Sequence, residues 1–362
     1  MAGYRVCAPQ PLEEFVTQVF RRLGADEDIA MEVARHLVKA NLSGHDSHGV
    51  IRVPQYVAQV EEGELVPSAR PIILREFGAT ALIDAQRGFG AYSTVWATDW
   101  GVEKARQHGV SAAAIRHSMH IGRVGEYTER AAEKGFISIV TVGAGGPGLG
   151  GMVPFHGLGH FLGANPWSIG VPARGRPPMI MDISSSTTAE GKVRVALAKR
   201  AQMPLGCILD RNGHPTTDPE DFYAGGSLVP LGGEVAGHKG YCMGMASLLL
   251  SALAMIDDPN PTYIGASTTQ QVVDPRGRMA GVFVIVIDPA AFGDKEHYEA
   301  MIGVNMAAAK RVPPVSGVEE VLVPGELEAI SRARREREGI ALPEATWQDL
   351  ARLAERFGLP MP

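Results

Sequence analysis

A short segment near the start of the chain concentrates side chains that can transfer protons. Residues 44–49 (GHDSHG) hold two imidazoles, a carboxylate and a hydroxyl between two glycines, and Arg52 follows closely. Because histidine titrates near neutral pH, this density of ionisable groups on a turn suits general acid and base catalysis. The alternative is a capped turn whose histidines only hydrogen-bond to the backbone.

The same segment offers a possible metal set. His45, Asp46 and His48 are residue types that bind zinc, so a metal-dependent hydrolase or lyase is the alternative from a different class of enzyme. Three ligands within four residues rarely converge on one ion without a partner elsewhere in the sequence. We therefore predict no metal site.

A second histidine-rich segment, RHSMHIGR at residues 116–123, follows a predicted strand and precedes a predicted helix. The carboxyl ends of strands face the ligand crevice in α/β sheets, so His120 is well placed for catalysis. A lone histidine at this position is more often structural. Two such turns in one chain, each bordered by Gly and Arg, favour a functional interpretation without showing that they meet.

Residues 143–151 (GAGGPGLGG) also follow a predicted strand. They lack the GxGxxG spacing and the amphipathic helix that define a Rossmann fingerprint. Asp182 to Ser186 end another strand with a carboxylate and hydroxyls, which suit ribose or phosphate oxygens but equally a helix N-cap. The glycine-rich segment remains either a surface loop or a ligand cover.

Lys239 stands at the predicted start of an apolar helix over residues 241–256. The helix dipole disfavours a cation there, so we expect Lys239 to face a ligand. The apolar run is shorter than the ~20 residues that span a bilayer, and it indicates a buried helix.

The composition narrows the class of protein. The chain has 362 residues, of which 45% are hydrophobic and 20% charged, and this is typical of a globular protein with room for two lobes. A net charge of -6 makes nucleic acid an unexpected partner. Three scattered cysteines, with no secretory signal in the opening residues, indicate a cytoplasmic protein.

Helical patterns open and close the chain, and strand patterns lie between them. Apolar residues recur at three- and four-residue steps near residues 12–38 and 54–62, and charge-rich helices are predicted over 324–338 and 345–357. Short apolar runs near residues 80, 112, 139, 181 and 285 alternate with helical ones such as 125–134, which predicts an α/β sheet buried on both faces. We place domain boundaries at 1–75, 76–295 and 296–362, the last part packing on the first or on a partner subunit.

Eight ordered segments together resemble the malate/L-lactate dehydrogenase family of the non-Rossmann kind. They cover nearly the whole chain and read GHDSHGVIRVPQY, RHSMHIGRVGEY, MVPFHG, LGANPWSIGVPA, MDISSSTTAEGKV, PLGCILDRNGHPTTDP, GHKGYCMGMASLLL and VPGELE. The chain departs from the family at Ala164, where relatives have threonine, and in the longer glycine-rich segment at 143–151.

The resemblance implies a non-Rossmann NAD(P)-binding sheet domain with a helical lobe made from both chain ends, assembled as a homodimer or larger. It implies an oxidoreductase that interconverts a 2-hydroxy acid and its 2-oxo acid with NAD or NADP as cofactor. Reduction of a cyclic imino acid with the same cofactor is the alternative. The chemistry fits the residues, because a hydride leaves C2 only as the hydroxyl loses its proton to a base.

The resemblance also implies roles for individual residues. His120 would exchange the proton at the substrate C2 oxygen, His48 would bind that oxygen, and Arg52 would grip the substrate carboxylate. Tyr56 and Gly145 complete the implied substrate contacts. The implied cofactor contacts are Asp182, Ile183, Ser184, Lys239, Gly277, Arg278, His156 and Asn165.

Overall fold

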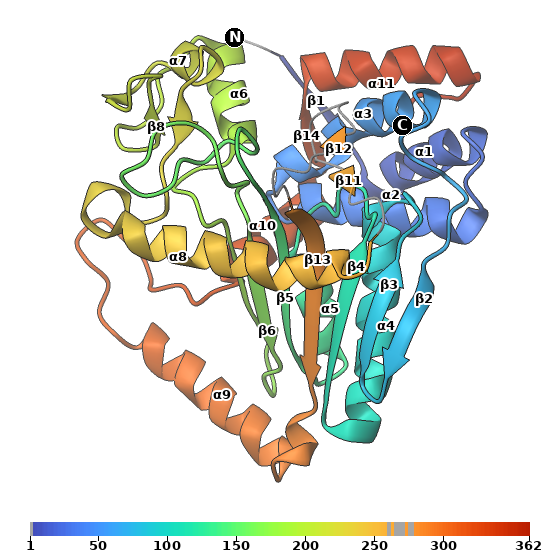
Figure 1. The fold of residues 1–362 in the computed structure, drawn as a ribbon, viewed down its shortest axis with the longest axis vertical. Coiled ribbons are helices and arrows are strands. Elements are labelled where there is room, and N and C mark those ends of the chain that lie inside the picture. The colour runs from blue at the N-terminus through green and yellow to red at the C-terminus, as the bar shows by residue number, and fades with distance from the viewer. Residues whose placement is uncertain (1–2, 259–261, 264–271, 274–278) are drawn as a thin grey trace.

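The fold is built around a mixed β-sheet with helices on both faces (Figure 1). The computed structural model describes residues 3–258, 262–263, 272–273 and 279–362 of the chain. Within these residues the sheet has seven strands in the order β2-β3-β4-β13-β5-β6-β7. They are β2 (Ile72–Phe77), β3 (Thr80–Asp84), β4 (Val110–Arg116), β5 (Ile137–Gly145), β6 (Trp167–Val171), β7 (Met179–Ile183) and β13 (Met279–Ile287).

Strand direction in the sheet is mostly antiparallel. Only β3 and β4 run parallel, joined by α4 (Gly90–His108), and β13 enters late in the chain between β4 and β5. Val282, Val284 and Val286 point to one face, where they pack against α4 and α5 (Gly125–Glu133). The five predicted apolar runs all form strands, whereas β2 and β6 are strands that the sequence analysis did not identify.

The two ends of the chain share one helical layer, which confirms the predicted helical lobe (Figure 1). Strand β1 (Tyr4–Cys7) pairs antiparallel with β14 (Ile340–Pro343), and α11 packs on α1 and α3. The position of the domain boundaries stays a prediction. The helices of this layer are α1 (Pro9–Arg22), α2 (Glu27–Leu42), α3 (Val53–Glu61), α10 (Glu326–Glu338) and α11 (Glu344–Phe357).

A smaller unit is formed by the segment between β7 and the long helix α8 (Gly233–Ser251) together with the segment between β5 and β6, and its core surrounds Met152, Val193 and Phe222. The remaining described elements are short, apart from α9 (Lys295–Lys310), and none of the described helices is long and apolar enough to cross a bilayer. They are α6 (Glu190–Lys199), β8 (Ile208–Leu209), β9 (Pro215–Thr216), α7 (Pro219–Tyr223), β10 (Ser227–Leu228), η3 (Ala252–Met255), β11 (Thr262–Tyr263), β12 (Val272–Val273) and η4 (Pro289–Ala291).

The glycine-rich segment begins inside the sheet, because Gly143 and Gly145 are the last residues of β5 and lie beneath α8. A Cβ atom at Gly143 would lie 2.5 Å from the carbonyl oxygen of Ser247, and one at Gly145 would lie 2.8 Å from Leu248 Cδ2. Close approach of helix and strand therefore requires glycine here, and an exposed loop is the wrong interpretation for this part of the segment.

Helix α8 is buried on one side only. Ser247 and Leu248 lie over the end of β5, and Leu248 is only 1% exposed, whereas Leu249 on the opposite side is 56% exposed. Gly240 and Gly244 are also buried, but they face segments outside the sheet. The predicted buried helix is therefore confirmed for one side of α8, and the other side is exposed.

We predict that Gly143→Ala lowers the free energy of unfolding by about 1–3 kcal/mol, because its methyl group would meet rigid helix backbone. Gly151→Ala is the control, since its Cβ would first meet the Phe222 ring at 3.3 Å, where a side chain can shift. Urea unfolding of both variants measures the difference. Equal losses in the two variants would show that the approach of α8 does not set the requirement for glycine.

Candidate active site

Two histidines from distant segments stack against each other in the structure. The rings of His48 and His120 have centroids 5.5 Å apart and planes inclined by 25°. His48 ends the short helix η1 (Asp46–His48), and His120 lies in the turn between β4 and α5. The two histidine-rich turns of the sequence therefore meet.

Tyr56 and Arg52 complete this group. The Tyr56 hydroxyl lies 2.7 Å from His120 Nδ1, which fixes one nitrogen of that ring. Arg52 ends η2 (Val50–Arg52); its Nε donates to the Ser47 carbonyl at 2.7 Å and its Nη1 to Gln55 Oε1 at 2.8 Å. These bonds hold the guanidinium beside the histidine pair without neutralising its charge.

Burial keeps both imidazoles of the pair neutral. Desolvation, with a smaller contribution from the positive charge of Arg52, lowers the pKa of His48 to about 3 and holds the pKa of His120 well below its usual value. Burial also raises the pKa of Tyr56 well above its ordinary range, so the phenol stays protonated. At neutral pH the group is a pair of neutral bases beside one cation.

His45 and Asp46, which precede His48, face the C-terminal helix α10 instead. His45 Nε2 lies 3.1 Å from Glu328 Oε1, and the Asp46 carboxylate accepts from Arg335 at 2.6 and 3.0 Å. Over the part of the chain that the structure describes, no three His, Cys, Asp or Glu residues are grouped as metal ligands. The metal set of His45, Asp46 and His48 is not formed, because ion pairs with α10 occupy two of its members.

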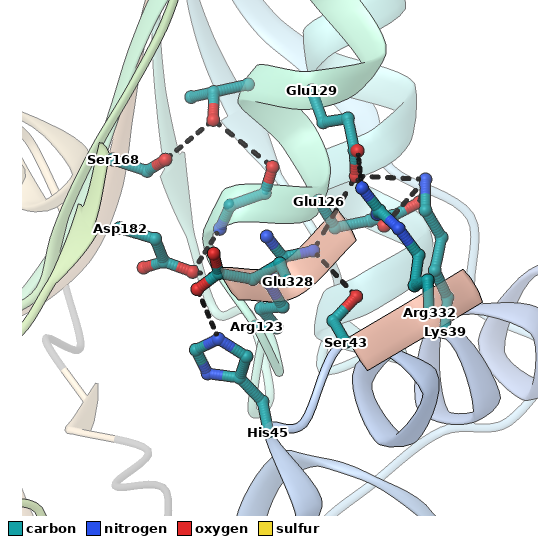
Figure 2. Close-up of polar contacts among 12 residues, drawn as sticks. Lys39, Ser43, His45, Arg123, Glu126, Glu129, Ser168, Asp182, Glu328 and Arg332 are labelled. Atoms are coloured by element: carbon teal, nitrogen blue, oxygen red, sulfur yellow. Dashed lines mark hydrogen bonds and ion pairs between the residues drawn. The ribbon is translucent and has the colours of Figure 1, made fainter. Parts of the chain in front are cut away.

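Figure 2 shows a buried ion-pair network directly behind this turn. The Arg332 guanidinium on α10 forms a bidentate pair with Glu129 on α5, and Lys39 on α2 lies 3.3 Å from the same carboxylate. Burial by itself would raise the pKa of Glu129, but these cations together lower that pKa to about 2. The sequence analysis missed this role of α10, because nothing in the spacing of its arginines indicates their partners.

Arg123 connects this network to the sheet. Its Nη1 lies 3.6 Å from Glu129 Oε2 and donates to Ser43 Oγ at 3.4 Å, while its Nε lies 3.5 Å from Asp182 Oδ2. Asp182 Oδ2 also accepts from the Gly125 amide at 2.9 Å, at the start of α5 (Figure 2). Burial raises the pKa of Asp182 despite the nearby arginine. The carboxylate therefore links β7 to the turn that carries His120.

The other residues implied to bind the cofactor follow from this point. Ile183 ends β7, and Ser184 is half-buried with its hydroxyl 3.3 Å from the Ala164 carbonyl. Asn165 is buried, accepts from the Ala144 amide at 3.0 Å and donates to the Gly244 carbonyl at 2.9 Å, so it joins β5 to α8. These residues form a continuous path from Asp182 to α8.

Two further candidates lie at the first half of α8. His156 stacks on the Phe155 ring at 3.9 Å, and Phe155 in turn contacts α8 at Gly237. Helix α8 begins at Gly233, so Lys239 lies in its second turn and not at its start. The Lys239 side chain is exposed. The dipole argument for Lys239 is therefore wrong, and its exposure is the remaining reason to consider it.

The structure thus brings together four candidates, His48, Arg52, Tyr56 and His120. Gly145 lies apart from them beneath α8. Gly277 and Arg278 fall outside the described residues.

Comparison with known proteins agrees with the sequence resemblance over the whole chain. A profile of the malate/L-lactate dehydrogenase family matches residues 7–351. Hydroxycarboxylate dehydrogenase B of Escherichia coli O157:H7 is 36% identical over 99% of this chain and 96% of its own. Malate dehydrogenase from Entamoeba histolytica superposes with a TM-score of 0.90 at 25% identity, covering 99% of each chain.

A reductase of a different name shares the same fold. The Δ1-piperideine-2-carboxylate reductase from Pseudomonas syringae pv. tomato superposes with a TM-score of 0.79 at 27% identity, covering 97% of this chain and all of that one. The fold and the full-length matches define an oxidoreductase. The chain belongs to the malate/L-lactate dehydrogenase family.

The buried histidines predict how stability depends on pH. His36 and His48 both have a pKa lowered to about 3 by burial, and His120 is shifted in the same direction. Below pH 6.5 the unfolded chain binds protons that the folded chain does not. We therefore expect the free energy of unfolding to fall from pH 6.5 to pH 5 by roughly 1.4 kcal/mol per pH unit for each such histidine.

Urea unfolding at several pH values measures this slope, and His48→Gln should remove one histidine's share of it. The lowered pKa of Glu129, about 2, contributes stability that is constant above the ordinary carboxylate pKa and is lost only at lower pH, so it does not affect this window. Stability that is constant or rises on acidification to pH 5 would contradict the neutral state of the pair.

Proposed function

We propose that this protein is an NAD(P)-dependent dehydrogenase that interconverts a 2-hydroxy acid and its 2-oxo acid. The observation that carries the proposal is the stacked pair of His48 and His120, half-buried and neutral, with the Arg52 guanidinium and the Tyr56 hydroxyl beside it. A base and a cation in one site are what a substrate with a hydroxyl next to a carboxylate requires. The names of the relatives, which are lactate, malate, sulfolactate and hydroxycarboxylate dehydrogenases, support this class of substrate.

His120 is the proposed proton carrier. The Tyr56 hydroxyl is hydrogen-bonded to His120 Nδ1, so Nε2 is the ring nitrogen left to contact the substrate C2 oxygen. In oxidation the neutral imidazole takes the hydroxyl proton, and in reduction the imidazolium returns it. His48, stacked on the same ring, hydrogen-bonds the C2 oxygen from the other side of the proposed site.

Arg52 couples substrate binding to the charge of the histidines. Its positive charge helps to lower the pKa of both rings in the free protein. A substrate carboxylate paired with this guanidinium would neutralise that charge and bring the pKa of His120 back toward its usual range. Binding of the 2-oxo acid would therefore favour the protonated form of His120, which donates the proton in reduction.

The residues along β7 and α8 fit a dinucleotide in chemical type. When bound, nicotinamide supplies or accepts the hydride at C2. The half-buried Ser184 hydroxyl and the exposed Lys239 ammonium are the donors that ribose and phosphate oxygens need. The proposed cofactor, NAD with NADP possible, would be held by Asp182, Ile183, Ser184, Lys239, Gly277, Arg278, His156 and Asn165.

Reduction of a cyclic imino acid is the second candidate. The likeness to the piperideine carboxylate reductase favours it, since that protein shares the fold over the full chain. A cyclic imine with a carboxylate would use the same guanidinium, and its nitrogen would take the place of the C2 oxygen.

We expect His120→Ala to lower turnover by ~10²–10⁴-fold, because the proton transfer loses its carrier while the cofactor site is unchanged. NADH fluorescence decay with pyruvate, phenylpyruvate, 2-oxoglutarate and a cyclic imine measures both turnover and substrate class. His214→Ala is the control, since this histidine is exposed on a turn beside Asp210. Unimpaired turnover in His120→Ala would remove this residue from the chemistry.

The exposed side of α8 supports a homodimer. Val235, Leu249, Leu253 and Ile256, on α8 and directly after it, are exposed by between 41% and 90%. An apolar surface of this kind marks a protein interface, because water contact with it is unfavourable. We propose that a second copy covers this face. A cytoplasmic location stays a prediction from the sequence.

The double variant Leu249→Asp with Leu253→Asp should shift the protein from dimer to monomer in sedimentation velocity, because two charges would be buried without partners. Phe77→Asp is the control, since Phe77 is 82% exposed on β2 at the far edge of the sheet. A dimer that persists in the double variant would exclude this face as the interface.

A further inference from the structure

His117 lies three residues before His120 and contacts two carboxylates from other parts of the chain. Its Nδ1 is 3.0 Å from Asp84 Oδ2, and its Nε2 is 3.0 Å from Asp258 Oδ2. Asp84 is the last residue of β3, and Asp258 follows η3 at the end of the α8 segment. One imidazole thus joins three separate segments.

The contacts of His117 fix its charge state. An ionised carboxylate only accepts hydrogen bonds, and a neutral imidazole donates from one nitrogen alone. Two carboxylate partners therefore require both ring nitrogens to be protonated. The group is shielded from water, with side-chain exposures of 20% for His117, 12% for Asp84 and 4% for Asp258.

Among the residues that the structure describes, Arg116 on β4 also takes part in the group, by donating its Nε to Asp84 Oδ2 at 3.1 Å. The hydrogen bond that His117 donates to Asp84 raises the pKa of His117, and the charges of Asp84 and Asp258 add to this effect, while burial and Arg116 oppose it. The neighbouring Arg87 side chain is directed to the Gly63 carbonyl.

The backbone around His117 is held in an unfavourable conformation. His117 has a φ of 51°, and Gln86 and Arg87 in the facing turn have φ values of 53° and 60°. Residues with side chains rarely adopt this left-handed region, and they keep it only where their surroundings impose it. The Arg87 amide donates to the His117 carbonyl at 2.9 Å, and the Gln86 amide donates to Asp84 Oδ1 at 2.7 Å.

These two turns form the immediate support of His120. The Met119 amide donates to the Gly88 carbonyl at 3.3 Å. A Cβ atom at Gly90 would lie 2.1 Å from the Met119 carbonyl oxygen and 2.6 Å from that of His120. A movement of the His117 turn would therefore move the backbone of His120.

We propose that His117 is a positioning residue whose doubly protonated ring holds Asp84 and Asp258 together and thereby fixes the His120 turn against the end of the α8 segment. The proposal rests on the proposed function only in taking His120 as the proton carrier. Deprotonation leaves one donor between two carboxylates, so one contact is lost. We call the contacts of His117 with Asp84 and Asp258 the clamp. Both contacts are formed below the ordinary histidine pKa, and one is lost as pH rises through the raised pKa of His117.

The first test is a proton NMR titration of the histidine Cε1–H signals in the full chain, with His117→Gln to assign the signal. We expect His117 to titrate above the ordinary value of about 6.5. His214 is the matched control, since it also has an aspartate partner, Asp210 at 3.5 Å, but its side chain is 77% exposed. A His117 signal that titrates at or below 6.5 would overturn the proposal.

The second test breaks the other side of the clamp with Asp258→Asn. We expect amide hydrogen exchange in residues 116–121 to accelerate by ~10-fold and kcat to fall by ~10–100-fold with little change in KM, because His120 is displaced rather than removed. His117→Lys, a permanent cation, should keep its protection factor at pH 9, where that of the wild type falls. Asp210→Asn is the matched control and should change neither quantity.

An unchanged protection factor in Asp258→Asn, or a wild-type protection factor in residues 116–121 that does not fall between pH 6 and 9, would refute the clamp, because the protection factor is corrected for the intrinsic rise of exchange with pH. Neither the titration nor the exchange requires turnover. An active His120→Ala variant would therefore refute the proposed proton carrier while leaving the clamp intact, and the two failures can be told apart.

Discussion

The structure depends on holding two stacked, half-buried imidazoles together in their uncharged form. His48 and His120 come from turns far apart in the chain, and neither turn belongs to a long regular element that could hold it rigidly. Burial that lowers the pKa of both rings leaves the pair without a strong attraction of its own. The surrounding layers must therefore hold each turn from behind.

Ion pairs hold the two histidine turns in place without contacting the His48 and His120 rings. Arg335 pairs with Asp46, and Arg332 pairs with Glu129, so α10 fixes the first turn and α5 together. Buried ion pairs add little net stability, because desolvation offsets their attraction, but their geometry is specific. On the second turn, Asp84 receives bonds from Arg116 and the Gln86 amide. Position, rather than stability, is what these networks contribute.

Helix α8 combines two requirements on opposite faces. Gly143 has no side chain, which allows α8 to approach β5 closely at Ser247 and Leu248. Val235 and Leu249 are left on its outer side. Close helix packing inside the subunit thus creates the apolar surface that supports assembly outside it.

The sequence by itself determined the α/β class, five of the strands, the helical character of both chain ends and the family, because local periodicity and ordered segments carry that information. It also selected His48, Arg52 and His120 by residue type. Only the tertiary structure decided that β13 lies between β4 and β5, that α8 approaches β5 closely at Gly143, that Asp46 pairs with α10, and that His117 joins Asp84 to Asp258. These features depend on contacts between residues far apart in the chain, whose free energy is set by packing and pairing geometry that no local pattern records.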